Sequence, residues 1–242
     1  MVKKTRLPNA SRGREPEVDG RKARATGRTV RGRKTRVQLL AAAKTVFVRD
    51  GFLHARIADI CEEAGVSYGS FYTYFTSKEE IFQELLDSIE IDLLDVSADV
   101  SDGDAYERIY SANAHFLEQY RKNAGILAVI DQVVTFDPES RARRDAREQA
   151  FADVLERSMR QYQSEGLVDA RLHPRIAASA LGAMVEAFAK GMYITGRSSG
   201  YDLDTVIEQL TLLWTNALGM APREPRSATK RESGALASTK RR

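Results

Sequence analysis

One short stretch constrains the fold of this sequence more than any other: residues 56–75, where two apolar-periodic segments are separated by a glycine. Apolar side chains recur at helical spacing in the first segment and predict a helix over about 56–63. Gly65 follows, at a tight turn that a Cβ would strain. Ser67 is a good N-cap for a second short helix that extends through Phe75. Two short helices joined by a glycine-containing turn indicate a helix-turn-helix.

The rest of the chain body also has helical periodicity, without the alternation of polar and apolar residues that is typical of a half-buried strand. Ser77 followed by Glu80 predicts a capping box at the start of the fourth helix. The sequence therefore predicts an all-α protein with about nine helices, at about 34–50, 56–63, 67–75, 77–98, 104–121, 123–134, 138–165, 174–196 and 203–219.

The charge is unevenly distributed, because an acidic body carries two basic tails. Residues 1–36 hold 13 Lys and Arg against three acidic residues, and 221–242 hold seven against two, whereas 37–220 hold 17 against 29. Both tails are rich in Gly, Pro, Ser, Thr and Ala, a composition that predicts disorder. We expect about 24–36 to contact phosphates or a minor groove. The alternatives are a solubilising tail or an over-long translation start. For the first twenty residues we favour these alternatives over DNA contact.

Composition excludes several classes of protein. A single cysteine and three histidines without ligand spacing leave little material for a disulfide framework or a metal site. Apolar residues make up 43% of the chain, but no run approaches the roughly 20 residues of a membrane span, and we expect a cytoplasmic protein. The sequence has no glycine-rich phosphate loop and no nucleophile motif. We therefore expect no catalytic residues, no metal and no cofactor.

Residues 51–82, GFLHARIADICEEAGVSYGSFYTYFTSKEEIF, resemble the DNA-binding signature of the tetracycline-repressor (TetR) family. The resemblance covers about residues 34–80. Its matching elements are Ile57-x-x-Ile60, Ala64-Gly65-Val66-Ser67, Gly69-Ser70-Phe71-Tyr72-x-Tyr74-Phe75 and Ser77-Lys78-Glu79. The chain departs from the pattern at Ala55, where the family often has a helix-capping Thr, at Cys61 and at Tyr74. The last departure bears on phosphate contact or operator preference.

The resemblance implies a domain organisation and a DNA-binding face. The expected segments are a disordered basic arm (1–33), a helix-turn-helix domain (34–80), a helical ligand-binding and dimerisation domain (81–220) and a disordered basic tail (221–242). Val66, Phe71 and Phe75 share one side and should be core. The expected DNA-contacting residues are Tyr68, Gly69 and Ser70 at base edges, Ser67, Tyr72 and Tyr74 at phosphates, and Lys34, Arg36, Arg56 and Lys78 as further contacts.

Alternatives remain for two of these residues: Gly69 eases the helix into its turn, or Lys78 is a solvated surface lysine. The short helix itself carries little charge, so non-specific affinity must come largely from Lys34, Arg36 and the arm. We therefore expect removal of residues 1–33 to weaken DNA binding and to flatten its dependence on salt.

The second half of the sequence predicts a dimer and a ligand pocket. Small residues along 174–196 and an apolar stripe along 203–219 let helices approach closely, so two such helices per subunit are expected to form a four-helix interface. Intrachain packing is the alternative for some of them. The expected interface residues are Ala180, Met184, Ala187, Leu210, Leu213 and Trp214. A symmetric dimer would favour a pseudo-palindromic operator.

The resemblance also implies a cavity among the central helices. The expected lining is apolar and aromatic, from Phe116, Tyr120, Ile130, Phe151, Leu155, Met159, Tyr162 and Phe188, with Asn113, His115 and Gln132 as further polar candidates. Such a lining favours an apolar or amphipathic effector, for example a lipid, an acyl thioester, a steroid or a drug. On any one helix, however, such a stripe is more often plain core.

The resulting hypothesis is a ligand-responsive transcriptional regulator, most simply a repressor that its effector releases from DNA by a population shift. The alternative is an architectural protein that coats DNA with its two basic tails and has no ligand control. Binding to a palindrome and to random DNA at fixed salt separates the two hypotheses.

Overall fold

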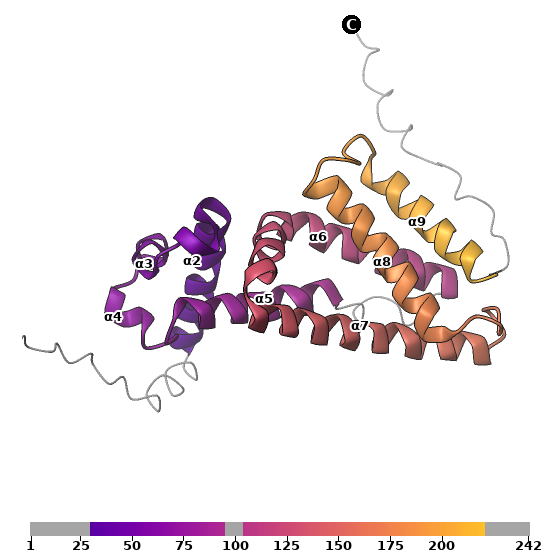
Figure 1. The fold of residues 1–242 in the computed structure, drawn as a ribbon, viewed down its shortest axis with the longest axis horizontal. Helices are drawn as coiled ribbons and strands as arrows, with labels where there is room; N and C mark the ends of the chain where they lie inside the picture. Colours follow the sequence, from indigo (N-terminus) through magenta and orange to yellow (C-terminus); the bar gives the residue numbers. More distant parts are fainter. Residues whose placement is uncertain (1–29, 95–103, 221–242) are drawn as a thin grey trace, which may run out of the picture. The chain divides into compact units, whose positions relative to one another are not determined.

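The computed structural model describes residues 30–94 and 104–220, and no strand occurs within these ranges (Figure 1). The all-α prediction is confirmed. The predicted tails lie outside the described residues, except for the last few residues of the N-terminal arm. The eight helices of the described part are α2 (Val30–His54), α3 (Ile57–Ala64), α4 (Tyr68–Phe71), α5 (Lys78–Leu94), α6 (Ala105–Phe136), α7 (Pro138–Ser164), α8 (Pro174–Tyr193) and α9 (Leu203–Ala217).

Among the described residues, none of these helices combines the length and the apolar character that a membrane crossing needs.

The predicted helices at 104–121 and 123–134 are a single helix, α6, which corrects the predicted count. We expected a break near Asn123, but this side chain is buried and its Oδ1 accepts a hydrogen bond of 2.6 Å from Lys44 Nζ. The amide is thus satisfied by a tertiary contact, and it does not cap a new helix. The prediction failed because sequence periodicity cannot show a partner 79 residues away.

The start of the chain body also differs from the prediction. Helix α2 begins at Val30, four residues before the predicted start, and it absorbs the end of the predicted arm. Gly51 interrupts this helix with a φ of 73° and a ψ of 161°, directly after the predicted end at residue 50, and a last turn follows it.

The described residues form two compact units, each with its own packing. The first contains residues 30–93 and 123–143, so α5, the end of α6 and the start of α7 join the helix-turn-helix in this unit. Its core is aromatic: the rings of Phe47 and Phe82 meet edge to face at 5.1 Å, and Phe71 and Phe75 are fully buried.

The second unit contains residues 104–122 and 144–220 of the described chain. Helices α8 and α9 lie side by side in it (Figure 1). Helix α8 packs on α7 through a small residue, because a Cβ at Gly182 would lie 3.4 Å from both Phe151 and Leu155. Helix α9 is tied to α6 by a buried hydrogen bond of 3.1 Å from Asn113 Nδ2 to Thr211 Oγ1. Polar pairing in a core fixes which helices meet.

Candidate nucleic-acid interface

The turn between α3 and α4 has the geometry that the sequence predicted. Gly65 adopts the left-handed conformation, with a φ of 65° and a ψ of 32°. The amide of Val66 then donates to the carbonyl of Cys61 at 3.0 Å, which closes the C-terminus of α3. No side chain caps the N-terminus of α3 at Arg56, as expected from the loss of threonine at Ala55.

Ser67 is the N-cap of α4: its Oγ accepts a hydrogen bond of 3.2 Å from the amide of Ser70. The helix is a single turn whose inner side is anchored by Phe71 and, just beyond it, by Phe75, both with no exposed surface. Val66 is only half-buried, so it contributes less to the core than expected. One side of α4 is therefore fixed and the other is presented to solvent.

The outward side of α4 carries the residues that the sequence predicted at base edges. Tyr68 is 54% exposed and Gly69 is exposed, while Ser70 and Tyr72 are half-buried. The two tyrosines form a pair, with ring centroids 5.3 Å apart and hydroxyls 3.1 Å apart. The contact with Tyr72 restricts the orientation of the Tyr68 ring. The pair presents an aromatic surface together with a hydroxyl.

Gly69 is not required by the fold. No heavy atom lies within 4 Å of the position that its Cβ would take, and its φ is outside the left-handed region that favours glycine. A glycine in a helix costs up to about 1 kcal/mol relative to alanine. The missing side chain thus leaves the surface of α4 open to a molecule that approaches from outside.

Two predicted phosphate contacts have partners inside the domain. Lys78 Nζ donates to the carbonyls of Phe52 and Ala55, at 2.8 and 3.1 Å, and lies 4.6 Å from the centroid of the Phe52 ring. Arg36 pairs with Glu84 and also donates to the carbonyl of Tyr74. Both cations join separate elements of the first unit. Neither the contact with Phe52 nor Glu84 had been predicted from the sequence.

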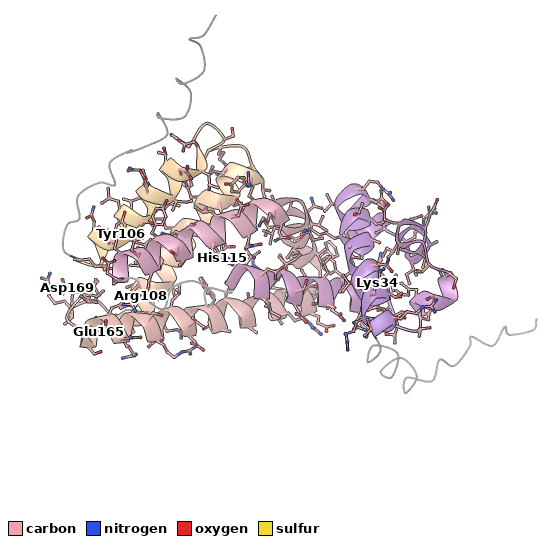
Figure 2. The ribbon with its side chains drawn as sticks, turned by 180° about the vertical axis from the view of Figure 1, so that it is seen from behind. Lys34, Tyr106, Arg108, His115, Glu165 and Asp169 are labelled. Atoms are coloured by element: carbon pink, nitrogen blue, oxygen red, sulfur yellow. The ribbon has the colours of Figure 1, made fainter. Side chains whose placement is uncertain are left out.

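The other predicted cations are on the surface. Arg56 is exposed and pairs with Asp59 at 2.9 Å, an interaction that raises the pKa of the guanidinium and lowers that of the carboxyl. Lys34 is exposed on α2 (Figure 2). Tyr74 is half-buried at the end of the segment that follows α4. Surface ion pairs contribute little to stability, so Arg56 is free to exchange partners at small cost.

A cavity of about 590 Å³ lies within the first unit. It is lined by three phenylalanines, six acidic residues and three other polar side chains: Phe52, Phe82, Phe136, Glu79, Glu80, Glu84, Asp87, Asp137, Glu139, Gln83, Ser140 and Arg143. None of these residues belongs to the pocket that we predicted from the sequence. An acidic lining of this kind disfavours phosphate.

The predicted pocket residues are divided between the units. Tyr120, Met159 and Tyr162 are buried in the second unit, where Phe116, Phe151, Leu155 and Phe188 are half-buried. Ile130 is buried in the first unit. Of the polar candidates, Asn113 is buried and bonded to Thr211, and His115 is half-buried on α6 (Figure 2).

The second unit also holds buried polar atoms that the sequence did not single out. Arg108 of α6 lies over the Tyr162 ring at 5.3 Å (Figure 2 labels Arg108). Within the described residues, Arg108 Nε, Tyr193 Oη and Trp214 Nε1 are buried and have no hydrogen-bond partner. Burial also raises the pKa of the Tyr162 and Tyr193 hydroxyls.

The predicted dimer residues fall into two groups. Ala180, Ala187 and Leu213 are exposed, with Leu213 at 53%, and Met184 is half-buried. Leu210 and Trp214, in contrast, are buried in the core of their own unit, as the alternative of intrachain packing expects. The exposed apolar surface of α8 and α9 also includes two side chains that were not predicted, Ile176 and Leu212, at 68% and 44% exposure.

The comparisons with known proteins agree with this geometry. The family described as "Bacterial regulatory proteins, tetR family" matches residues 39–85. The HTH-type transcriptional regulators YfiR of Bacillus subtilis and TtgR of Pseudomonas putida are 44% identical over 55 residues and 43% over 56, which is 23% of this chain. The matched segment spans only 27% of the length of each relative.

Solved structures extend the likeness to the whole helical body. NalD, the secondary repressor of the MexAB-OprM multidrug efflux pump in Pseudomonas aeruginosa, superposes with a TM-score of 0.64 at 24% identity, over 78% of this chain and 98% of that one. FadR of Bacillus subtilis, in complex with stearoyl-CoA, gives 0.64 at 18%, over 74% and 97%. These likenesses show a shared fold: an all-α protein with an N-terminal helix-turn-helix. Residues 39–85 therefore match the DNA-binding segment of bacterial regulatory proteins of the tetR family.

Proposed function

We propose that this protein is a cytoplasmic transcriptional regulator that reads double-stranded DNA with the outward side of α4. The observation that carries the proposal is the division of α4 into a buried side at Phe71 and an exposed side at Tyr68 and Gly69. A helix anchored in this way inserts its N-terminal residues into the major groove. Tyr68, Gly69 and Ser70 then face base edges.

The phosphate contacts in this proposal come from residues around the helix. In this proposal the hydroxyls of Ser67, Tyr72 and Tyr74 contact phosphates, and Lys34 and Arg56 supply exposed positive charge. Lys78 has one donor left after its two bonds to carbonyls, and that donor is available for a phosphate. The resulting affinity falls as salt rises, because each phosphate contact releases counterions.

We infer a homodimer in which α8 and α9 of two subunits form a four-helix interface. The support is the exposed apolar and small-residue surface of these helices, including Ala180, Ala187 and Leu213. Exposed apolar surfaces of this kind commonly mark association sites. A two-fold dimer presents two copies of α4, so the operator is expected to be pseudo-palindromic, with half-sites one helical turn or a multiple apart.

We also infer a small, mostly apolar or amphipathic effector that releases the protein from DNA. Support comes from the aromatic residues buried in the second unit and from the bound stearoyl-CoA of the FadR neighbour. Release requires only that the effector binds the DNA-incompetent conformer more tightly than the competent one.

A selection of genomic fragments by the purified protein tests the proposal directly. The recovered sequence is compared with a shuffled duplex at the same salt concentration, with and without candidate acyl thioesters. A specificity ratio of about 10³ or more supports the regulator, and a fall in that ratio with a ligand supports the effector.

A ratio near unity favours the alternative, a protein that coats DNA through its basic tails. In that case substitutions on the exposed side of α4 should leave DNA binding at the wild-type level, because coating needs charge and not base contacts.

A further inference from the structure

Arg36 lies where three elements of the first unit meet. From α2, its Nε donates to Glu84 Oε1 in α5 at 2.6 Å, and its Nη2 donates to the other carboxylate oxygen. Its Nη1 donates to the carbonyl of Tyr74 at 3.1 Å, and its guanidinium lies 4.5 Å from the centroid of the Phe75 ring. The side chain is 31% exposed.

These contacts hold the C-terminal end of the DNA-reading segment. Tyr74 lies in the turn that follows α4, beyond the C-cap at Tyr72. Arg36 supplies both a donor and a positive charge to the carbonyl of Tyr74. The planar guanidinium also covers the Phe75 ring, which is fully buried on its other sides.

A continuous set of contacts connects this end with the exposed surface of α4. Phe75 lies 5.8 Å from Phe71, and Phe71 lies 5.5 Å from Tyr72, both measured between ring centroids. Tyr72 in turn pairs with Tyr68. A shift of the Phe75 ring is therefore transmitted to the aromatic pair that faces solvent, because packed rings move together.

We propose that Arg36 is a positioning residue, which Glu84 holds in place so that it fixes the orientation of α4, and that it is not a phosphate contact. This inference rests on the proposed function, because it concerns how well α4 reads DNA. Three of the five N–H donors of Arg36 are used inside the domain. A phosphate contact would have to compete with the Glu84 pair, which is already bidentate and charge-assisted. The hydrogen bond to Glu84 also raises the pKa of Arg36.

The two roles predict opposite results for Glu84→Gln. This substitution removes a negative charge near the DNA-reading helix, so simple electrostatics predicts tighter or unchanged DNA binding. If Glu84 positions Arg36, the variant instead loses affinity for the selected operator by roughly tenfold, a typical coupling between contacting residues. Its binding to shuffled DNA should stay at the wild-type level, because that binding depends on charge.

Arg36→Lys gives a second, independent comparison. Lysine keeps the positive charge but has neither the planar fork nor the extra donors of arginine. A phosphate contact would survive this change, whereas the positioning role predicts a roughly tenfold loss for the operator with an unchanged slope of affinity against salt. The double variant should lose no more than either single variant. The control is Glu148→Gln, which removes a surface partner of Arg144 in α7 at 2.9 Å and should change nothing.

Amide hydrogen exchange supplies a readout without DNA. The peptide spanning residues 68–75 should exchange faster in both variants than in the wild type, and the second unit should be unaffected. Operator affinity at the wild-type level in both variants, or unchanged exchange of 68–75, overturns the inference while the proposed function stands. If the wild type itself does not distinguish the operator from shuffled DNA, the proposed function fails, and this inference fails with it.

Discussion

Lys44 of α2 and Asn123 of α6 are joined by a hydrogen bond of 2.6 Å between Nζ and Oδ1. Next to this bond the two helices are in close contact, because a Cβ at Gly125 would lie only 3.0 Å from Cγ1 of Val48. The first helix of the DNA-binding unit is thus fixed to a helix that continues, without a break, into the second unit.

Asn123→Ala should therefore destabilise the first unit. It leaves the half-buried ammonium of Lys44 without its acceptor, and burial already lowers the pKa of this group, an effect that Asp92 opposes. Hydrogen bonds to charged groups contribute about 1.5–3 kcal/mol, and partial exposure of Lys44 reduces this to about 1 kcal/mol. Urea unfolding measures the difference. Lys44→Met in the same background should restore part of the loss, and a stable Asn123→Ala protein would show that the bond contributes little.

Alanine substitutions at Gly69 and Gly65 should have opposite effects on the stability of the folded protein. Gly69→Ala meets no crowding and needs no left-handed backbone, so folded stability should be unchanged or slightly higher, while operator binding falls. Gly65→Ala puts a Cβ on a residue with a φ of 65°, which costs about 1–2 kcal/mol. Thermal unfolding and DNA titration of both variants measure these effects. Unchanged operator affinity in Gly69→Ala contradicts close approach of DNA at this position.

Local signals made the helix-turn-helix predictable. The turn at Gly65 and the cap at Ser67 are encoded within a few residues, and the structure reproduces both. The predicted capping box was correct only in part: Ser77 Oγ accepts from the amide of Glu80, but the Glu80 carboxylate turns to Thr76. The partners of Arg36 and Lys78 were missed, because they depend on contacts 48 and 26 residues away. Periodicity shows which side of a helix is apolar, but not which polar group a long cation will reach.

The link between α6 and α7 should respond to acid. Asp137 accepts hydrogen bonds from the Ser140 hydroxyl and amide, the latter at 3.0 Å, and these bonds lower the pKa of its carboxyl below the usual 3.8. A carboxyl with a lowered pKa in the folded state stabilises the protein above pH 3.8, and this contribution is lost as the pH falls through the lowered value. Urea unfolding of the wild type should therefore show stability falling over that interval.

Asp137→Asn should flatten this part of the pH profile, since it removes the titrating group. Ser140→Ala should flatten it as well, because it removes the hydroxyl whose hydrogen bond contributes most to the lowered pKa of Asp137. Ser140 also accepts from Gln83 of α5 at 3.1 Å, so this variant should additionally lower stability at neutral pH. The same acid slope in all three proteins would show that other carboxyls dominate the response.

The surface of α8 and α9 allows the proposed dimer to be tested without unfolding the subunit. Leu213→Glu places a charge on a side chain that is 53% exposed in a single chain, so a monomer should tolerate it. In a dimer the same charge would be buried without a partner, at a cost of several kcal/mol that shifts the assembly to monomers. Sedimentation velocity measures the shift. Val154→Glu changes an apolar residue of similar exposure (46%) on α7; it is the matched control and should leave the oligomeric state as it is. Trp214→Ala should instead unfold the second unit, since this ring is 7% exposed within its own chain. Dimers that persist in Leu213→Glu would place the interface elsewhere, and the expected spacing of the two α4 helices on DNA would have to be derived from that other surface.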